Sequence, residues 1–198
     1  MISIYKIKPK FQKLLLPILH FFNKLGITAN QITFSAIFLS VVIGVLFWFA
    51  DYNSYFYLTL PIGLLLRMAL NALDGMMARI YKQQSKKGEL LNEFGDIISD
   101  LIIFLPLIKY ESQDILLVVL FISLSIINEF AGLLGKVISN ERRYEGPMGK
   151  SDRAFVIAIY GILGFIQVNL HNYITYIFIG LILLLLLSTI TRLTKSLK

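Results

Sequence analysis

The sequence predicts an all-α polytopic membrane protein with six transmembrane helices and an N-terminal amphipathic interfacial helix, and three observations support this. The chain of 198 residues is 57% hydrophobic and only 16% charged, whereas a soluble domain carries about a quarter charged residues. Its apolar residues form long blocks rather than alternating or heptad patterns. Its basic residues gather between those blocks, on alternate connections. We therefore expect one membrane domain over residues 1–198.

The interfacial helix is expected over residues 9–25, before the first apolar block. Apolar residues recur there with the 3.6-residue period of a helix, and they are Phe11, Leu14, Leu15, Ile18, Leu19, Phe22 and Leu25. Such a segment lies on a membrane surface rather than crossing it. A signal peptide is the alternative, but Asn23 and Lys24 break the apolar run and no small-residue cleavage site follows.

Six blocks are long enough to cross the bilayer, which requires about 20 mostly apolar residues. They form an expected bundle over 31–191, and the individual spans are 31–50, 55–73, 89–108, 115–137, 153–169 and 173–191. The fifth span is the weakest, because Asp152 and Arg153 lie at its entrance. Glu129 in the fourth span is costly in a membrane and needs a partner, for which Arg67 is a candidate.

The distribution of basic residues predicts the orientation. Every Lys and Arg except Arg67 and Lys109 lies in the N-terminal segment, the second-to-third connection, the fourth-to-fifth connection or the C-terminal tail. Positive charge marks the cytoplasmic side, so both termini are expected in the cytoplasm, with the protein in the plasma or inner membrane if it is bacterial. This pattern also explains the net charge of +7 by topology and headgroup attraction, and argues against nucleic acid as a partner.

The residue types available restrict the chemistry. The chain has no cysteine, which excludes disulfides, thiolate metal sites and a cysteine nucleophile. The histidines His20 and His171 do not have a ligand-like spacing. Any bound metal is therefore expected to have oxygen ligands.

Polar residues form a stripe on each of two neighbouring predicted helices. The second helix carries Arg67, Asn71, Asp74 and Ala78, and the third carries Gly88, Asn92, Asp96 and Asp100, all at spacings of three or four. A basic loop joins these helix ends, so both stripes are expected at one membrane depth, where oxygen ligands from two helices suit Mg²⁺. The alternatives are a structural polar network between helices and a cation pathway of a transporter. The density of polar groups argues against the first, and the second gives residues 74–79 no role.

The spacing of these residues resembles that of a known family. The chain contains Asn71-x2-Asp74-Gly75-x2-Ala78-Arg79-x8-Gly88-x3-Asn92-x3-Asp96. The CDP-alcohol phosphatidyltransferases carry D-x2-D-G-x2-A-R-x8-G-x3-D-x3-D across their second and third transmembrane helices, and every spacing agrees. The segment Gly26–Thr33 also resembles their G-x-T-P-N-x-x-T, with Ala29 in place of proline.

Two positions depart from the family pattern, because Asn71 and Asn92 replace its first and third aspartates. Asparagine keeps a carbonyl oxygen as a ligand but loses the negative charge. Asp100, one turn further along the third helix, could supply another carboxylate. The substitutions leave open a site that binds metal more weakly, a site that relies on the charge of the substrate pyrophosphate, or an inactive site.

The resemblance implies transfer of a phosphatidyl or related phosphoalcohol group from a CDP-alcohol, expected to be CDP-diacylglycerol, to an acceptor hydroxyl with release of CMP. It implies Mg²⁺ or Mn²⁺ as cofactor, and also a homodimer. The implied metal ligands are Asp74, Asp96, Asn71 and Asn92, with Asp100 as a further donor. The implied roles of the other residues are Asp96 for deprotonating the acceptor, Gly75, Ala78, Arg79 and Gly88 for the nucleotide, and Arg143, Lys150 and Arg153 for a polar acceptor.

Two other functions remain open from the sequence. The first is a catalytically impaired relative that binds a CDP-lipid or partner proteins. The second is a cation-coupled transporter that uses the intramembrane acids.

Overall fold

The computed structural model describes residues 8–170 and 172–197, and every regular element within them is helical. The long helices are α1 (Lys8–Lys24), α2 (Ala29–Trp48), α3 (Thr59–Ile80), α4 (Lys86–Phe104), α6 (Ile115–Ser139), α7 (Lys150–Phe165) and α8 (Ile174–Ser196). Three short elements join them: η2 (Ser54–Leu58), α5 (Leu107–Tyr110) and η3 (Ser112–Asp114). Lys6, His171, Lys198 and the side chain of Lys8, which entered the sequence analysis, lie outside the described part.

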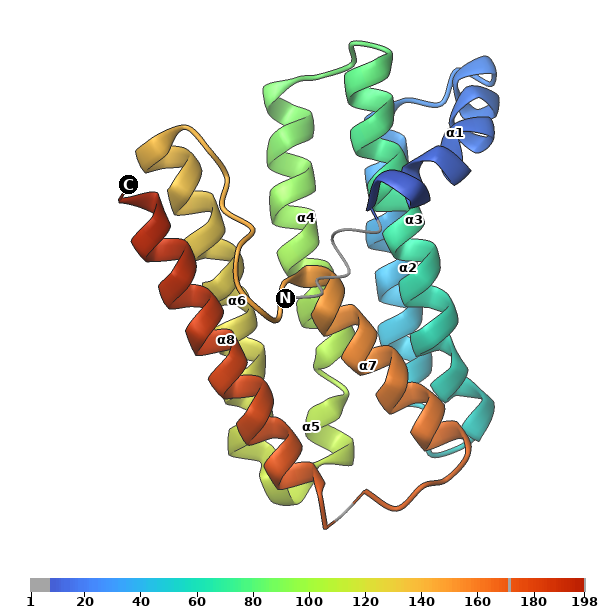
Figure 1. Cartoon of the computed structure of the whole chain (residues 1–198). Coiled ribbons are helices and arrows are strands. Elements are labelled where there is room, and N and C mark those ends of the chain that lie inside the picture. The colour runs from blue at the N-terminus through green and yellow to red at the C-terminus, as the bar shows by residue number, and fades with distance from the viewer. Residues whose placement is uncertain (1–7, 171, 198) are drawn as a thin grey trace.

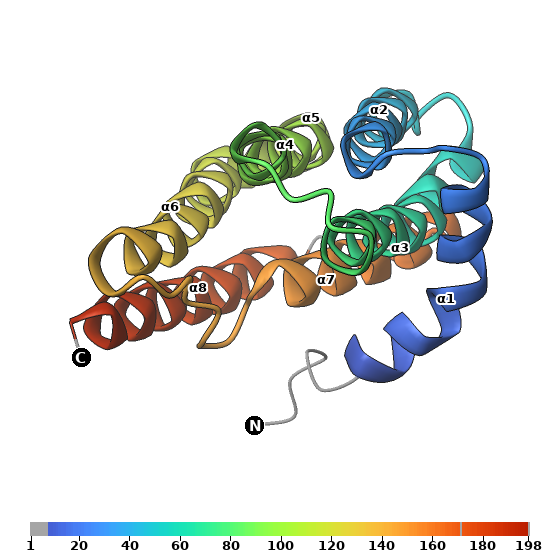
Figure 2. The ribbon, with the colours of Figure 1, turned by 90° about the horizontal axis from the view of Figure 1, so that it is seen from above.

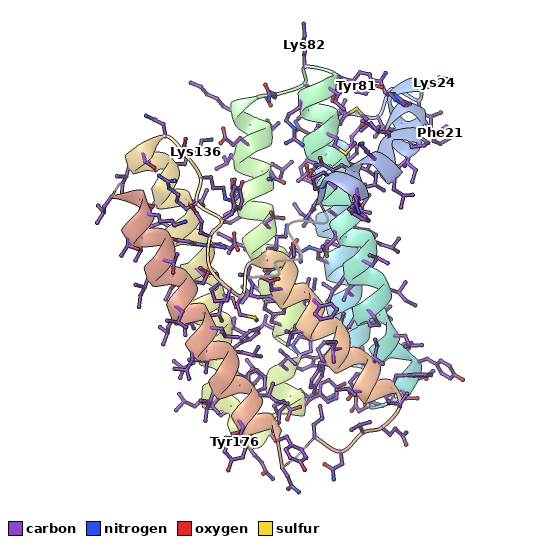
Figure 3. All side chains as sticks on the ribbon, in the orientation of Figure 1. Phe21, Lys24, Tyr81, Lys82, Lys136 and Tyr176 are labelled. Carbon is purple, nitrogen blue, oxygen red and sulfur yellow. The ribbon has the colours of Figure 1, made fainter. Side chains whose placement is uncertain are left out.

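The bundle has two rows of helices, with α2, α4 and α6 in one row and α3, α7 and α8 in the other (Figure 2). Within and between the rows, α2 packs against α3 and α4, α3 against α7, and α6 against α4 and α8. The α3–α4 connection and the C-terminal ends of α6 and α8 lie at the same end of the bundle (Figure 1). Lys24, Lys82 and Lys136 lie at this end and Tyr176 at the opposite one (Figure 3). We call it the basic end.

Each of the six predicted spans is found as a helix, with shifted bounds. Four segments are long and apolar enough to cross a membrane, namely Ala29–Trp48, Ser54–Ile80, Ser112–Ser139 and Ile174–Ser196. The other two differ for clear reasons, because α4 carries several acidic residues and α7 has only 16 residues. Six crossings and cytoplasmic termini thus stay predictions.

Aromatic packing fills the half of the bundle opposite the basic end. The buried rings of Phe104 and Phe121 lie 5.3 Å apart between centroids, and those of Phe121 and Phe178 lie 5.8 Å apart. These contacts join α4, α6 and α8. Close packing of this kind holds membrane helices together in the absence of a hydrophobic driving force between them.

Helix α1 forms where the interfacial helix was predicted, but its apolar residues are divided between two faces. Leu15 and Leu19 are buried in a cluster with Leu73 and Met77 of α3. The exposed apolar residues lie on the other side of α1, and they are Leu14, Ile18, Phe21 and Leu25. Only part of the predicted apolar face is therefore available to a lipid surface, and contact with that surface stays a prediction.

The connection from α1 to α2 combines two local devices. Gly26 has a φ of +74°, the left-handed conformation that commonly ends a helix. Thr28 then caps α2, and its side chain and that of Gln31 form a reciprocal capping box. These devices fix the start of α2 at the basic end.

The connection over residues 140–149 lies against the bundle rather than outside it. The Arg143 amide donates to the carbonyl of Gly132 at 3.1 Å. Gly146 has a φ of +96°, and a Cβ atom there would lie only 2.6 Å from Cα of Ser188. The segment thus runs along α6 and α8, and α7 begins part-way along the bundle (Figure 1).

Candidate functional site

A first cavity of about 540 Å³ opens at the basic end. The lining includes Asp74, Gly75 and Ala78 from the end of α3, together with Gly88 and Asn92 from the start of α4. The structure therefore brings together five of the residues that the motif predicted. The start of α2 and Lys136 of α6 complete the wall.

Asp74 is oriented by a residue of α2. The Thr33 hydroxyl donates to Oδ2 of Asp74 at 2.9 Å, and both side chains are buried. Thr33 is the last residue of the Gly26–Thr33 motif, and the sequence predicted no role for it. Its function is to hold one of the predicted metal ligands in a single orientation.

Ala29, which replaces the proline of the family pattern, forms a backbone hydrogen bond that proline could not form. Its backbone N–H donates to Oε1 of Gln83 at 2.8 Å and so ties the α3–α4 connection to α2. Proline at this position would have no N–H to donate. Gly88 lies in the first turn of α4, where a Cβ atom would lie 2.7 Å from Oδ1 of Asn30. Glycine thus permits α4 to start close to α2.

Arg79 is exposed and lies beside the first cavity. A Cβ atom on Gly75 would lie 3.4 Å from Nη1 of Arg79, so the guanidinium covers that glycine. Lys136, which the motif does not include, also lines the cavity and pairs with Glu89 of α4. Its position on a distant helix gave no indication of this proximity.

A second cavity of about 400 Å³ adjoins the first, and Asn92 lines both. Its polar wall includes Asn71 and Asp96, with Lys150 at the start of α7. Apolar side chains, among them Leu64 and Leu65 of α3, form another part of the wall. The two polar stripes therefore contribute to two neighbouring spaces.

Asp96 accepts contacts from two other helices, α3 and α7. The Asn71 amide donates to Oδ1 of Asp96 at 3.2 Å, and the Lys150 ammonium pairs with the same oxygen. Arg67 donates to the backbone carbonyl of Asp96 at 3.3 Å. A carboxylate in place of Asn71 would repel Asp96 at this distance, whereas the amide forms a hydrogen bond with it.

Asp100, a predicted metal donor, and Arg153, a predicted acceptor contact, pair with each other in the structure. The two Asp100 oxygens accept from Arg67 at 2.7 Å and from Arg153 at 2.8 Å. Arg153 has a fully buried side chain and also donates to Glu129 at 2.9 Å. Neither Asp100 nor Arg153 lines either cavity, and both are engaged in ion pairs, so the roles of Asp100 as a metal donor and of Arg153 as an acceptor contact stay predictions.

Glu129 is the centre of a buried cluster of charges. It accepts from Arg142 and from Arg153, each at 2.9 Å, and lies 3.7 Å from Arg192. Arg67 was the predicted partner, and this prediction was wrong because Arg67 pairs with Asp100 instead. The expectation that Glu129 needs cationic partners is met by α7, α8 and the 140–149 segment.

Of the two consecutive arginines in the 140–149 segment, Arg142 rather than Arg143 lines the second cavity. Arg143 lies 3.2 Å from Glu141 and donates to Ser139 at 3.1 Å. Arg142 pairs with Glu93 as well as Glu129, and its guanidinium lies 5.0 Å from the ring centre of Tyr144. Burial lowers the pKa of Arg142, but the charges of Glu93, Tyr144 and Glu129 together outweigh burial and raise this pKa above its ordinary value.

The predicted metal ligands that line the two cavities are all oxygen donors. Within residues 8–170 and 172–197, no three His, Cys, Asp or Glu side chains are grouped closely enough to hold a metal ion. Asp74 and Asp96 with the amide oxygens of Asn71 and Asn92 form an all-oxygen set containing two carboxylates. Mg²⁺ is commonly held by one or two carboxylates, with water and substrate phosphate completing its coordination.

Comparison with known proteins is consistent with this geometry. The model of the CDP-alcohol phosphatidyltransferase family matches residues 26–191. The inner membrane protein YnbA of Escherichia coli K12 is 45% identical over 160 residues, which cover 81% of this chain and 79% of that protein. This likeness and the four apolar helices identify an integral membrane protein.

Two solved structures of phosphatidylinositol phosphate synthase PgsA1 from Mycobacterium tuberculosis share the fold. The structure with manganese and citrate has a TM-score of 0.75 and 18% identity, covering 92% of this chain and 88% of that one. The structure with CDP-DAG bound has a TM-score of 0.76 and 19% identity, covering 93% and 94%.

Proposed function

The chain belongs to the CDP-alcohol phosphatidyltransferase family, and on this premise we propose that it transfers a phosphatidyl group from CDP-diacylglycerol to an acceptor hydroxyl with release of CMP. The observation that carries the proposal is the pair of adjoining cavities that share Asn92. One cavity would hold the donor and the other the acceptor. A solved protein of the same fold binds CDP-DAG, which supports this choice of donor.

The first cavity suits the nucleotide and pyrophosphate of the donor. Gly75, Ala78 and Gly88 leave space at its wall, and Lys136 lines it with a positive charge. Arg79, beside Gly75, would pair with phosphate oxygens as the donor enters. These contacts would fix the position of the phosphorus atom that is attacked.

A divalent cation would be held by Asp74 and Asp96, with Asn71 and Asn92 as neutral oxygen ligands. When bound, Mg²⁺ or Mn²⁺ would neutralise charge on the pyrophosphate and the departing CMP. A solved protein of the same fold contains manganese, which supports this class of ion. With two amides in the set, the protein contributes less negative charge than four aspartates would.

The second cavity would place the acceptor hydroxyl next to Asp96. Oδ1 of Asp96 is held by Asn71 and Lys150, which leaves Oδ2 to take the proton. As the O–H bond breaks, the acceptor oxygen forms a bond to phosphorus, and the bond from phosphorus to CMP breaks. Asp96 is thus the proposed catalytic base.

We also propose the membrane orientation and the oligomeric state of the protein. The basic end would face the cytoplasm of a bacterial inner membrane, because positive charge favours that side. The chain would act as a homodimer, as the family resemblance implies.

A catalytically impaired relative remains the second candidate function. Its support is the replacement of two motif aspartates by Asn71 and Asn92, which weakens the charge available to a metal. Such a protein would bind the CDP-lipid without transferring its phosphatidyl group.

One assay separates the two candidates. The purified protein in lipid nanodiscs receives labelled CDP-diacylglycerol, Mg²⁺ or Mn²⁺ and a panel of polyol and amino-alcohol acceptors, and CMP release is measured. We expect CMP with at least one acceptor. No CMP with any acceptor at saturating metal, with the lipid still bound, would favour the impaired relative. Cation flux in liposomes without nucleotide would instead favour a transporter.

A further inference from the structure

The second cavity is rich in cations, but each of them has a carboxylate partner. Its lining includes Arg67, Arg142, Lys150 and Arg192. Arg67 pairs with Asp100, Lys150 with Asp96, and Arg192 with Glu129. Arg142 pairs with both Glu93 and Glu129. The positive charge of this cavity is therefore largely neutralised by the protein itself.

These pairs are not easily exchanged for an anionic ligand. Glu129 has a side chain that is only 7% exposed and stands against three arginines. A phosphate group that took Arg142 or Arg192 would leave Glu129 with fewer partners and would itself approach a buried carboxylate. Removing one partner of a buried charge pair is strongly unfavourable.

The buried polar atoms without a hydrogen-bond partner around this cavity include both donors and an acceptor. Among the described residues, Nε of Arg67 and Nε of Arg142, which line the cavity, are buried donors with no hydrogen-bond partner, and Oε2 of Glu93, the ion-pair partner of Arg142, is such an acceptor. A hydroxyl group can both donate and accept, whereas a phosphate dianion can only accept. A ligand with several hydroxyl groups thus complements both kinds of atom.

We propose that the second cavity selects an uncharged polyol over a phosphorylated one as the acceptor, and that Glu93 and Glu129 impose this selection by neutralising the arginines. The proposal rests on the proposed transferase function and specifies its acceptor class. The opposing interpretation is that the carboxylates only orient the arginines for a phosphate. The two interpretations predict opposite preferences between matched acceptors.

The experiment compares each polyol with its own phosphomonoester in the nanodisc assay. The pairs are glycerol with glycerol 3-phosphate and myo-inositol with inositol 1-phosphate, and kcat/KM for CMP release is measured with CDP-diacylglycerol and Mg²⁺. We expect the free polyol of at least one pair to be preferred at least tenfold. Preference for the phosphomonoester in both pairs would overturn the inference and leave the transferase function intact. No CMP with any acceptor would overturn both.

The variant Glu93→Gln tests the assigned cause. This variant removes the ion pair of Arg142 with Glu93 and leaves its ion pair with Glu129. Glu129→Gln would also weaken the ion pair of the fully buried Arg153, so it carries a greater risk of unfolding the protein. Because a charge-assisted hydrogen bond changes affinity by about tenfold or more, the preference should shift about tenfold toward the phosphomonoester. Glu141→Gln is the matched control, since Glu141 pairs with Arg143 outside the cavity. An equal preference in all three proteins would overturn the role of Glu93.

Discussion

Asp100 and Arg153, 53 residues apart in the chain, form a buried ion pair of 2.8 Å that joins α4 to α7. Arg67 occupies the other oxygen of Asp100, and Glu129 the other side of Arg153. The four side chains thus connect α3, α4, α6 and α7 by alternating charges. Beneath the two cavities, this chain of ion pairs fixes the relative positions of the helices that carry them.

We predict that Asp100→Asn lowers stability rather than metal affinity. Loss of one partner from a buried pair leaves Arg153 and Arg67 with less compensation, which costs about 3 kcal/mol or more. Thermal unfolding in nanodiscs measures the first effect, and the Mg²⁺ concentration for half-maximal CMP release measures the second. An unchanged unfolding temperature with a raised Mg²⁺ requirement would instead support Asp100 as a metal ligand.

Asp96→Asn should reduce CMP release by at least about 100-fold, because a general base contributes that much or more. The matched control is Asp114→Asn, where the carboxylate accepts from Thr175 at the end of the bundle opposite the cavities. The control should keep nearly full activity. Comparable activity in the two variants, both folded by thermal unfolding, would mean that another group accepts the proton.

Asn92→Asp should strengthen binding of the divalent cation. The new carboxylate adds one negative charge beside Asp74 and Asp96. Its attraction to a divalent cation at contact distance, even when screened by water, is enough to raise the affinity for the cation about tenfold. The readout is the half-saturating Mn²⁺ concentration by direct titration. Asn140→Asp is the control, because Asn140 caps the end of α6 with a φ of 58° and lines neither cavity. Equal shifts in both variants would exclude Asn92 from the metal site.

Gly146→Ala should destabilise the protein by about 2 kcal/mol, as expected for a side chain forced into a left-handed conformation. The added Cβ would also collide with Ser188 and displace the segment that carries Arg142. Thermal unfolding and the KM for the acceptor measure these effects. Gly180→Ala in α8 is the control, since its Cβ would meet no atom within 4 Å. Stability equal to the control would mean that the segment is not fixed against α8.

The sequence predicted the features that depend on local periodicity. Long apolar blocks located all six helices, and spacings of three and four brought Asp74, Asn92 and Asp96 to adjoining surfaces. Residue order alone gave no information on which charges meet across the bundle. The pairing of Arg153 with Asp100 joins α7 to α4 across 53 residues of sequence, and helical periodicity gives no information on contacts between distant helices.

The 140–149 segment escaped prediction for a similar reason. Its glycines and charges are typical of an exposed connection, and their partners lie on helices far away in the sequence. Arg142 was overlooked in favour of Arg143 because adjacent residues in an irregular segment give no period from which to choose the inward one. In the structure the Arg143 backbone donates to Gly132 of α6, while the Arg142 side chain lines the second cavity.

The position of this segment has a consequence for biosynthesis. The Glu145 carbonyl accepts from Ser188 and Arg192, both on α8, which the ribosome makes after the segment itself. The contacts of the segment with α8 can therefore form only after α8 has been synthesised, so the wall that carries Arg142 is completed late in biosynthesis.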